Sequence, residues 1–486
     1  MLRRLTPALA ALTLAILPGM VQPVLAEEEG RPITIGETLT IHSDILGEDR
    51  EVNIYTPAGF DREKGCPVVY LLDGGFHFHQ TTGAVSYLAA ADRIPGMMVV
   101  GIRNTDRTRD LTPTADPDSP AGEGGEADNF LRFITEELTP WLEDRYGAQT
   151  PRVLIGHSFG GLFAIHALRQ RPDFFQGIIA ISPSMQWDEE ALAASAWDWL
   201  QDDAHQAAVS SLYITAGNEG MGLLGGSHRL AGALSSHAPT TLRWSFHHMP
   251  DESHMSVPYR STCDGLEWIF EGWDLPDPVL AWEQGGWAAI DSHYHSLYRR
   301  LQMEGTVPGS VRNSIVFELV SKQRLDDACA FAADSAERFG PLPSDFWKFI
   351  AAEYRDRGDE AGALACCERA LEANPRDTWA REQIQQAGGT LPPLPDAYQV
   401  DRRLLETYAG VYTFEYGSVT VMVGDAGLEA DVMSEHVLLF ASSDVDFADD
   451  SGTTWTFDVR DGEVVGLTIN FGGRMFHLSR NDAPQS

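Results

Sequence analysis

The sequence is poor in cysteine and in positive charge. Only 5 of its 486 residues are cysteine; the odd number leaves at least one thiol unpaired, and the spacing does not match a zinc site. We therefore expect neither a disulfide scaffold nor a metal held by cysteine. The 35 lysine and arginine residues face 71 aspartate and glutamate residues, which leaves a net charge of −36. So acidic a surface disfavours binding to nucleic acid and to anionic lipid.

Long apolar runs are missing beyond the N-terminus, so no membrane span is expected there. Residues 1–26 have the order of a secretory signal peptide: Arg3 and Arg4, an apolar run over residues 8–17, and a small-residue cleavage site that ends at Ala26. A membrane anchor is the alternative, but Pro18 interrupts the run that it would need. We expect export with cleavage, and a mature protein that is periplasmic or secreted and not inserted in the membrane.

The length predicts two to four domains, at roughly 100–200 residues per domain. Residues 33–273 alternate strand-like and helix-like segments. Short, wholly apolar runs are typical of strands that are buried on both faces of a parallel sheet. Such runs occupy residues 67–72, 97–102, 153–155, 177–181 and 212–215, and helix candidates occupy residues 129–146 and 162–171. This order predicts an α/β domain with a doubly wound sheet.

A repeat of 34 residues follows within residues 310–388, after a connecting segment of residues 274–309. In the second copy, Trp347, Tyr354, Ala363 and Pro375 fall at the spacing of a tetratricopeptide unit. We expect a small α-helical repeat region, with an unrelated helical bundle as the alternative. The repeats are also a candidate surface for a protein partner.

The period of the apolar residues changes to two in residues 396–480, beyond the proline-rich linker of residues 391–395. Alternation over residues 418–423, 453–459 and 464–471 is typical of half-buried strands. We expect a small antiparallel β domain, either a barrel or a sandwich.

The strongest chemical motif is the G-x-S-x-G run around Ser158. It follows the apolar strand of residues 153–155 and opens the helix that continues from Leu162. In that context the motif is a nucleophile elbow, in which a tight, strained turn exposes the serine at the start of a helix. We therefore predict Ser158 as the catalytic nucleophile of an α/β-hydrolase fold.

A serine hydroxyl needs a base, and in this fold the acid and then the histidine follow the serine in sequence. His254 lies between the strand-like residues 242–248 and a helix from about Val257, and we predict it as the base. Glu219, in the turn after residues 212–215, is the predicted acid. Asp251 is the alternative, because it shares the loop of the histidine. Either carboxylate could hold the imidazole tautomer and stabilise its cation.

The negative oxygen of a tetrahedral intermediate needs backbone N–H donors. We expect one donor from Phe159, immediately after the nucleophile. We expect the other from Gly75, with Phe76 as the alternative, in the loop after residues 67–72.

These features resemble the esterase D-like group of α/β-hydrolases, which includes siderophore, feruloyl and acetylxylan esterases and mycolyltransferases. The matching pieces cover residues 39–272 and comprise residues 43–57, 70–74, 101–113, the serine elbow, residues 182–184 and the His254 loop. The resemblance implies an acyl-enzyme esterase that uses Ser158 and His254. Residues 405–412 (LETYAGVY) likewise make the β domain similar to lipocalin-like modules appended to some secreted serine hydrolases.

Four further residues are candidates for substrate binding. Arg103, Arg107 and Arg109 follow a strand at the edge where ligands bind, and they could hold a carboxylate or an anionic catecholate. Pairing with Asp106, Asp110 or Asp116 is the alternative. The chain departs from the family's frequent Ser-Pro-Ser-x-Trp-Trp in having Ser184-Met185-Gln186-Trp187, which touches a pocket wall, so we expect Trp187 there. His77 and His79 are expected to line the pocket rather than to bind a metal.

We therefore expect an exported serine esterase that acts on a small-molecule ester, siderophore or aromatic-acyl esters being candidates, with no cofactor and no metal. An acyltransferase with the same triad is one alternative. A non-catalytic binding or scaffold protein on a degenerate hydrolase fold is the other.

Overall fold

The computed structural model describes residues 33–115, 123–340, 342–395, 398–414, 417–424, 427–432, 435–449, 452–460, 462–471 and 474–481. The predicted signal peptide, residues 1–26, lies outside these residues. The chain divides into two units, residues 1–35 and 36–486, and the elements below all belong to the second.

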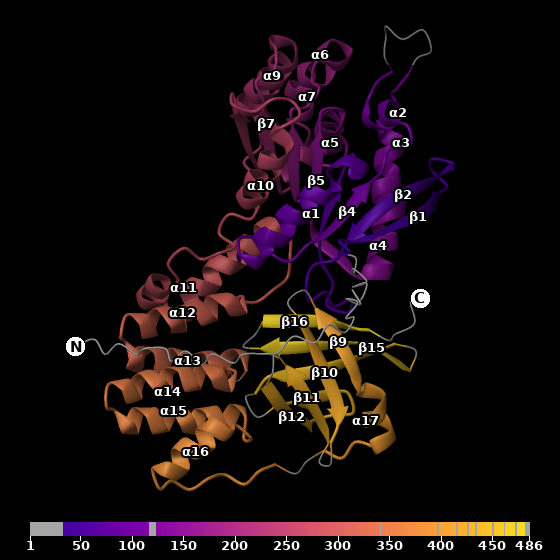
Figure 1. Ribbon diagram of the computed structural model, residues 1–486. Helices are drawn as coiled ribbons and strands as arrows, with labels where there is room; N and C mark the ends of the chain where they lie inside the picture. Colours follow the sequence, from indigo (N-terminus) through magenta and orange to yellow (C-terminus); the bar gives the residue numbers. More distant parts are fainter. Residues whose placement is uncertain are drawn as a thin grey trace, which may run out of the picture. The chain divides into compact units, whose positions relative to one another are not determined.

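The first part of this unit is an eight-stranded sheet with the order β1-β2-β4-β3-β5-β6-β7-β8 (Figure 1). The strands are β1 (Glu37–Ser43), β2 (Glu48–Tyr55), β3 (Cys66–Leu71), β4 (Met98–Ile102), β5 (Ala148–His157), β6 (Gly177–Ile181), β7 (Ser210–Ala216) and β8 (Leu242–His248). Strands β3 to β8 run parallel to one another, whereas β2 is antiparallel to both of its neighbours.

Helices cover both faces of this sheet. Alternate side chains of its strands therefore enter two separate hydrophobic cores, one on each face. Val69 and Ile155 pack with α1 (Gly74–Ala90) and α10 (Val257–Ile269) on one face. Tyr70 and Leu154 pack with α3 (Ala127–Arg132), α5 (Phe159–Gln170) and α9 (Met221–His237) on the other. The expected α/β fold with a doubly wound sheet is confirmed.

The helix expected over residues 129–146 is instead three segments: α3, the π-helix η1 (Phe133–Leu138) and α4 (Thr139–Tyr146). Pro140 lies in the first turn of α4 and has no N–H to donate to the preceding turn. The Thr139 hydroxyl donates to the Ile134 carbonyl instead, 2.8 Å away. A proline inside an apolar helical pattern therefore explains the change of helix type.

Residues 274–309, expected as a connecting segment, contain the long helix α11 (Pro278–Leu301). The Asp277 side chain caps its start by accepting from the Leu280 N–H at 2.9 Å. Ile290, Tyr294 and Leu301 are buried along one side. This helical spacing of apolar residues drives the segment to fold.

Five helices follow, and successive ones lie against each other (Figure 1). They are α12 (Gly309–Ser321), α13 (Leu325–Phe339), α14 (Ser344–Asp356), α15 (Glu360–Ala373) and α16 (Thr378–Gln386). Phe331, Trp347, Ile350 and Cys367 are buried in their core. The region is helical, as expected, and its assignment as tetratricopeptide repeats stays a prediction.

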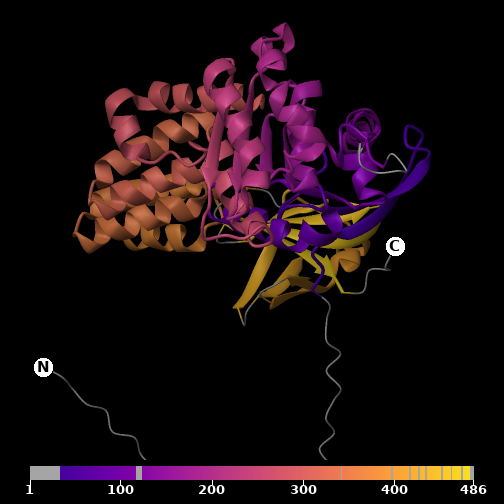
Figure 2. The ribbon, with the colours of Figure 1, turned by 90° about the horizontal axis from the view of Figure 1, so that it is seen from above.

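The C-terminal part is a closed antiparallel barrel, preceded by α17 (Arg402–Tyr408) and visible in yellow and orange in Figure 2. Its strands are β9 (Gly410–Phe414), β10 (Gly417–Val423), β11 (Leu428–Val432), β12 (Glu435–Ala441), β13 (Asp446–Ala448), β14 (Thr454–Arg460), β15 (Glu463–Phe471) and β16 (Arg474–Arg480). Aliphatic and aromatic side chains fill its core, with Tyr408, Tyr412 and Phe457 among the aromatic ones. The expected antiparallel β domain is confirmed and is a barrel rather than a sandwich.

The remaining helices are short: α2 (Arg107–Leu111), α6 (Trp187–Ala194), α7 (Ala196–Trp199) and α8 (Asp203–Ala207). Within the described ranges, no helix is both long enough and apolar enough to cross a membrane.

Candidate active site

The predicted site residues follow the carboxyl ends of parallel strands, which meet at one edge of the sheet. Gly75 follows β3, Ser158 follows β5, Glu219 follows β7 and His254 follows β8. Ligands of open α/β sheets bind at this edge. The topology therefore brings together residues that lie far apart in sequence, from Gly75 to His254.

Ser158 sits on a strained turn between β5 and α5. Its φ of 61° and ψ of −116° are unusual for a residue with a side chain. Gly156 makes the turn possible, because a Cβ there would lie 2.1 Å from the Gly160 carbonyl oxygen. The Ser158 hydroxyl lies 3.2 Å from the hydroxyl of Ser184. This backbone presents the serine side chain at the start of a helix, as a nucleophile elbow does.

His254 and Glu219 form a close pair. The His254 Nδ1 atom lies 2.8 Å from the Glu219 Oε1 atom, and the Glu219 side chain is 4% exposed. Burial alone would raise the pKa of the Glu219 carboxyl, but hydrogen bonds from His254 and Ser182 outweigh it and hold that pKa below its ordinary value. A charged carboxylate therefore faces one ring nitrogen of His254 and leaves the other nitrogen for a proton transfer.

Hydrogen bonds tie the Glu219 loop to the His254 loop and to the loop that follows β6. The Asn218 N–H donates to the Glu252 carbonyl at 2.6 Å. The Gly217 N–H donates to the Ser182 hydroxyl at 3.2 Å. Asp251 is exposed, and no hydrogen bond joins it to His254 among the described residues. Of the two carboxylates weighed as the acid, the structure places Glu219 and not Asp251 against the histidine.

Two more histidines extend this group. The His157 ring lies 4.5 Å, centroid to centroid, from the ring of His254 and 5.4 Å from that of His77. Burial, together with the neighbouring His254 and His77, lowers the pKa of His157 to about 4. His157 is therefore neutral near pH 7 and packs against His254 rather than competing with it for a proton.

Two helix N-termini could supply N–H donors to an oxyanion. Phe159 is the first residue of α5, and Gly75 is the second of α1, positions whose N–H groups have no acceptor within their own helix. The Phe76 N–H, in contrast, donates to the Asp73 carbonyl at 2.8 Å. The N–H group of Phe76 thus already has an acceptor, which favours Gly75 over Phe76 as the oxyanion donor from that loop.

Arg107 contacts the segments that carry the two predicted donors, Gly75 and Phe159. Its Nε and Nη2 atoms bind the two carboxylate oxygens of Asp73 at 2.6 and 2.9 Å, and its guanidinium lies 5.2 Å from the ring centre of Phe159. Burial opposes the charge on Asp73, but Arg107 and Asn104 hold the pKa of that carboxyl below its ordinary value. Arg107 thus contacts both loops of the site and has its charge balanced by a buried carboxylate.

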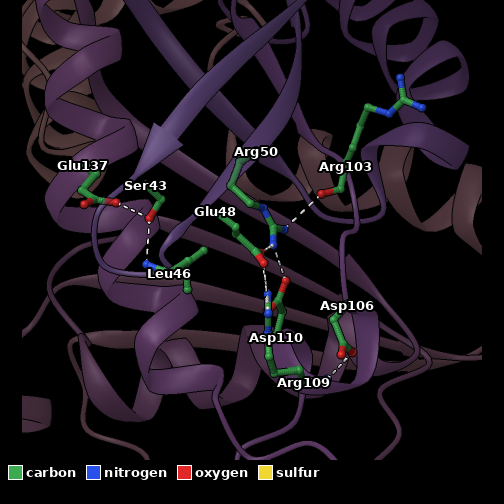
Figure 3. Close-up of polar contacts among 9 residues, drawn as sticks. All are labelled: Ser43, Leu46, Glu48, Arg50, Arg103, Asp106, Arg109, Asp110 and Glu137. Atoms are coloured by element: carbon green, nitrogen blue, oxygen red, sulfur yellow. Dashed lines mark hydrogen bonds and ion pairs between the residues drawn. The ribbon is translucent and has the colours of Figure 1, made fainter.

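The other two arginines do not share this position. Arg109 binds Glu48 and Asp110, in a network around the fully buried Arg50 (Figure 3). The structure therefore does not bring Arg109 to the site. Arg109 instead forms an ion pair with Asp110, the alternative weighed from the sequence. The Arg103 side chain points away from that network in Figure 3, and its Nε atom lies 3.3 Å from Glu51.

The position of Arg103 is close to the oxyanion loop, because a Cβ on Gly75 would lie 3.8 Å from the Arg103 Nε atom. Asp116, the third carboxylate weighed as an arginine partner, lies outside the described residues. The Trp187 ring packs edge-on against Phe159, 5.2 Å between centroids, and its Nε1–H donates to Thr114 at 3.1 Å. Arg103, Arg107 and Trp187 are therefore neighbours of the predicted donors.

Sequence reasoning missed three residues that contact this group. Asp73 anchors Arg107, Ser182 holds Glu219, and Ser184 approaches the nucleophile. A signal was available, since all three lie in the segments, residues 70–74 and 182–184, that carry the family resemblance. Among the described residues, no group of three or more His, Cys, Asp or Glu side chains could hold a metal ion.

Comparison with known proteins shows similarity to esterases. Residues 43–221 match the family model described as "Putative esterase". The ferri-bacillibactin esterase BesA of Bacillus subtilis is 39% identical over 144 residues, 26% of this chain and 50% of that protein. The siderophore triacetylfusarinine C esterase of Aspergillus fumigatus is 33% identical over 173 residues, 32% of this chain and 58% of that protein. The chain thus spans about half the length of the curated relatives it matches.

A solved structure extends the similarity of fold. An IroE-like serine hydrolase from Shewanella oneidensis superposes with a TM-score of 0.53 and 26% identity, covering 61% of this chain and 97% of that one. The fold of this part of the chain is therefore similar to that of a known serine hydrolase.

Proposed function

We propose that this protein is a serine hydrolase of small-molecule carboxylic esters. The observation that carries the proposal is the carboxylate–imidazole pair of Glu219 and His254, at 2.8 Å, on the sheet edge where Ser158 occupies its strained turn. The similarity to proteins named as siderophore esterases supports it.

The proposed reaction passes through an acyl-enzyme. The Ser158 oxygen attacks the ester carbonyl carbon while its proton passes to His254, and the carboxylate of Glu219 stabilises the imidazolium. The N–H groups of Phe159 and Gly75 hold the negative oxygen of the tetrahedral intermediate. His254 then returns the proton to the departing alcohol, and a water molecule releases the acid by the same steps.

An aromatic acyl group is the substrate feature that the described residues favour. Trp187 and Phe159 place two aromatic rings beside the predicted oxyanion donors. The charges of Arg107 and Arg109 are already balanced by Asp73, Glu48 and Asp110, which leaves Arg103 with its half-exposed partner Glu51 as the cation nearest Gly75. We propose aromatic-acyl esters, including those of siderophores, as the first compounds to test.

The test is hydrolysis of short-acyl, feruloyl and catecholate-lactone esters by the purified full chain and by its Ser158→Ala variant. The variant should keep its circular dichroism spectrum and lose turnover, retaining only the ~10³–10⁴ over water that binding and the oxyanion hole provide. An added alcohol distinguishes hydrolysis from acyl transfer by the products formed. Full turnover by Ser158→Ala would contradict the proposal.

We also propose that the protein is exported. The support is the order of basic, apolar and small residues in residues 1–26. Expression in a bacterium that secretes through signal peptides should yield a periplasmic or secreted protein whose N-terminal sequence begins at Glu27. A cytoplasmic product that retains Met1 would contradict export.

A further inference from the structure

Two of the five cysteines face each other in the helical region. Cys329 lies in α13 and Cys366 in α15, 37 residues apart in sequence, and their Sγ atoms are 3.1 Å apart. A disulfide bond is about 2.05 Å long. The two sulfur atoms would therefore have to approach each other by roughly 1 Å to form a disulfide bond.

The two thiols differ in a way that suits consecutive steps of oxidation. Cys366 is buried, whereas Cys329 is partly exposed. The hydrogen bond with Cys366 lowers the pKa of the Cys329 thiol and raises that of Cys366. Thiolates are the reacting form of cysteine, so Cys329 is the member of the pair that reacts first.

The other three cysteines lack these properties. Burial raises the pKa of Cys66 and of Cys367 to about 11, and it raises that of Cys263 as well. The only hydrogen bond between cysteine thiols in the described part of the chain, which contains all five, is that of Cys329 with Cys366. The pair is therefore distinct in geometry as well as in reactivity.

We propose that Cys329 and Cys366 are an oxidation site, which forms one intramolecular disulfide with an oxidant of the disulfide class. The Cys329 thiolate attacks a sulfur of glutathione disulfide and releases one glutathione thiolate. Cys366 then gives up its proton, and its sulfur attacks the sulfur of Cys329 and releases the second glutathione. The protein loses two protons and two electrons, and glutathione disulfide takes them up to form two glutathione thiols.

This bond joins α13 to α15, the second helices of the two consecutive helix pairs. It closes a loop that contains all of α14, and a closed loop restricts the unfolded chain more than the folded one. The helix pairs α12–α13 and α14–α15 form a short stack, and this link ties the two pairs together. Export, as proposed above, exposes the pair to oxidants of this class. The inference does not depend on ester hydrolysis.

The experiment counts the thiols that survive oxidation. The reduced full chain is incubated with glutathione disulfide, and the reaction is quenched with acid. The remaining thiols are then alkylated with N-ethylmaleimide in denaturant, and mass spectrometry gives the number of labels. The count should fall from the five cysteines of the sequence to three, with no glutathione retained on the protein. Five labels after oxidation, or a chain that retains glutathione, would overturn the proposal.

Adjacent cysteines supply a matched control. Cys366→Ser removes the thiol that releases the second glutathione, so after oxidation Cys329 should retain one glutathione and three of the four remaining thiols should label. Cys367→Ser leaves the pair intact, so the count should fall from four to two. Loss of two labels without bound glutathione in Cys366→Ser, together with retained glutathione in Cys367→Ser, would assign the bond to Cys367 and overturn the pairing. Cys329→Ser, at a less buried position, provides a second test if Cys366→Ser fails to fold; because it removes the thiol that reacts first, all four remaining thiols should label before and after oxidation.

Discussion

The most discriminating prediction concerns which carboxylate serves His254. Replacing Glu219 with glutamine removes one charge but keeps the size of the side chain. Because the Glu219 side chain is 4% exposed, water cannot take the place of the carboxylate. The variant should therefore lose the stabilisation of the imidazolium while the fold and the binding of substrate are kept.

The magnitude follows from the geometry. The Nδ1–Oε1 distance of 2.8 Å corresponds to charge centres about 4 Å apart, for which an effective dielectric constant of about 20 gives ~4 kcal/mol of attraction. At ~1.4 kcal/mol per factor of ten, the charge alone is worth about 10³ in rate. Glutamine can also donate to Nδ1 and stabilise the wrong tautomer, which extends the expected loss in kcat to ~10⁴.

Steady-state kinetics on an activated ester measure this effect. Glu219→Gln should lower kcat by ~10³–10⁴ with KM nearly unchanged, whereas the matched variant Asp251→Asn, at an exposed position away from the histidine, should change kcat less than about threefold. The opposite order would make Asp251 the acid. If neither variant loses more than tenfold, Ser158 and His254 act without a third member.

Three further outcomes are expected. Activity should fall with decreasing pH through the protonation of one base, His254, because His157 stays neutral until about pH 4; a rate that is flat from neutral pH to pH 4 would contradict this role. Gly156→Ala should lower the free energy of unfolding by at least ~3 kcal/mol, because the added Cβ would lie 2.1 Å from a backbone oxygen. Gly83→Ala, in α1 with open space around it, should raise the free energy of unfolding by about 1 kcal/mol. Urea denaturation measures both values, and equal effects would refute the packing argument. Asp110→Asn removes a partner of a fully buried guanidinium and should cost about 3 kcal/mol in the same assay; a loss below 1 kcal/mol would show that the network tolerates the missing charge.

Much of the fold could be read from local patterns. The buried strands are short apolar runs, and these patterns hold because a strand covered on both faces must be apolar throughout. The apolar spacing did not predict a helix where glycines interrupt it. Helix α11 was missed because Gly285 and Gly286 interrupt its apolar spacing, and φ at Gly286 is 58°.

The turn around Ser158 is a property of the sequence itself. The strand, the two flanking glycines and the following helix are consecutive, so their geometry depends on neighbours in the chain. The sequence also orders the serine, the acid and the histidine along the chain. It leaves two carboxylates, Glu219 and Asp251, within reach of His254.

Only the tertiary structure decided between them, because the choice depends on how two strand ends face each other. Glu219 and His254 meet through the adjacent strands β7 and β8, although 35 residues separate them. The partner of Arg107 was decided in the same way. Asp73 precedes it by 34 residues and follows β3, whereas the carboxylates weighed from the sequence are close neighbours of Arg107 along the chain. An ion pair forms where the folded sheet brings charges together, and nearness along the chain carries little information about that.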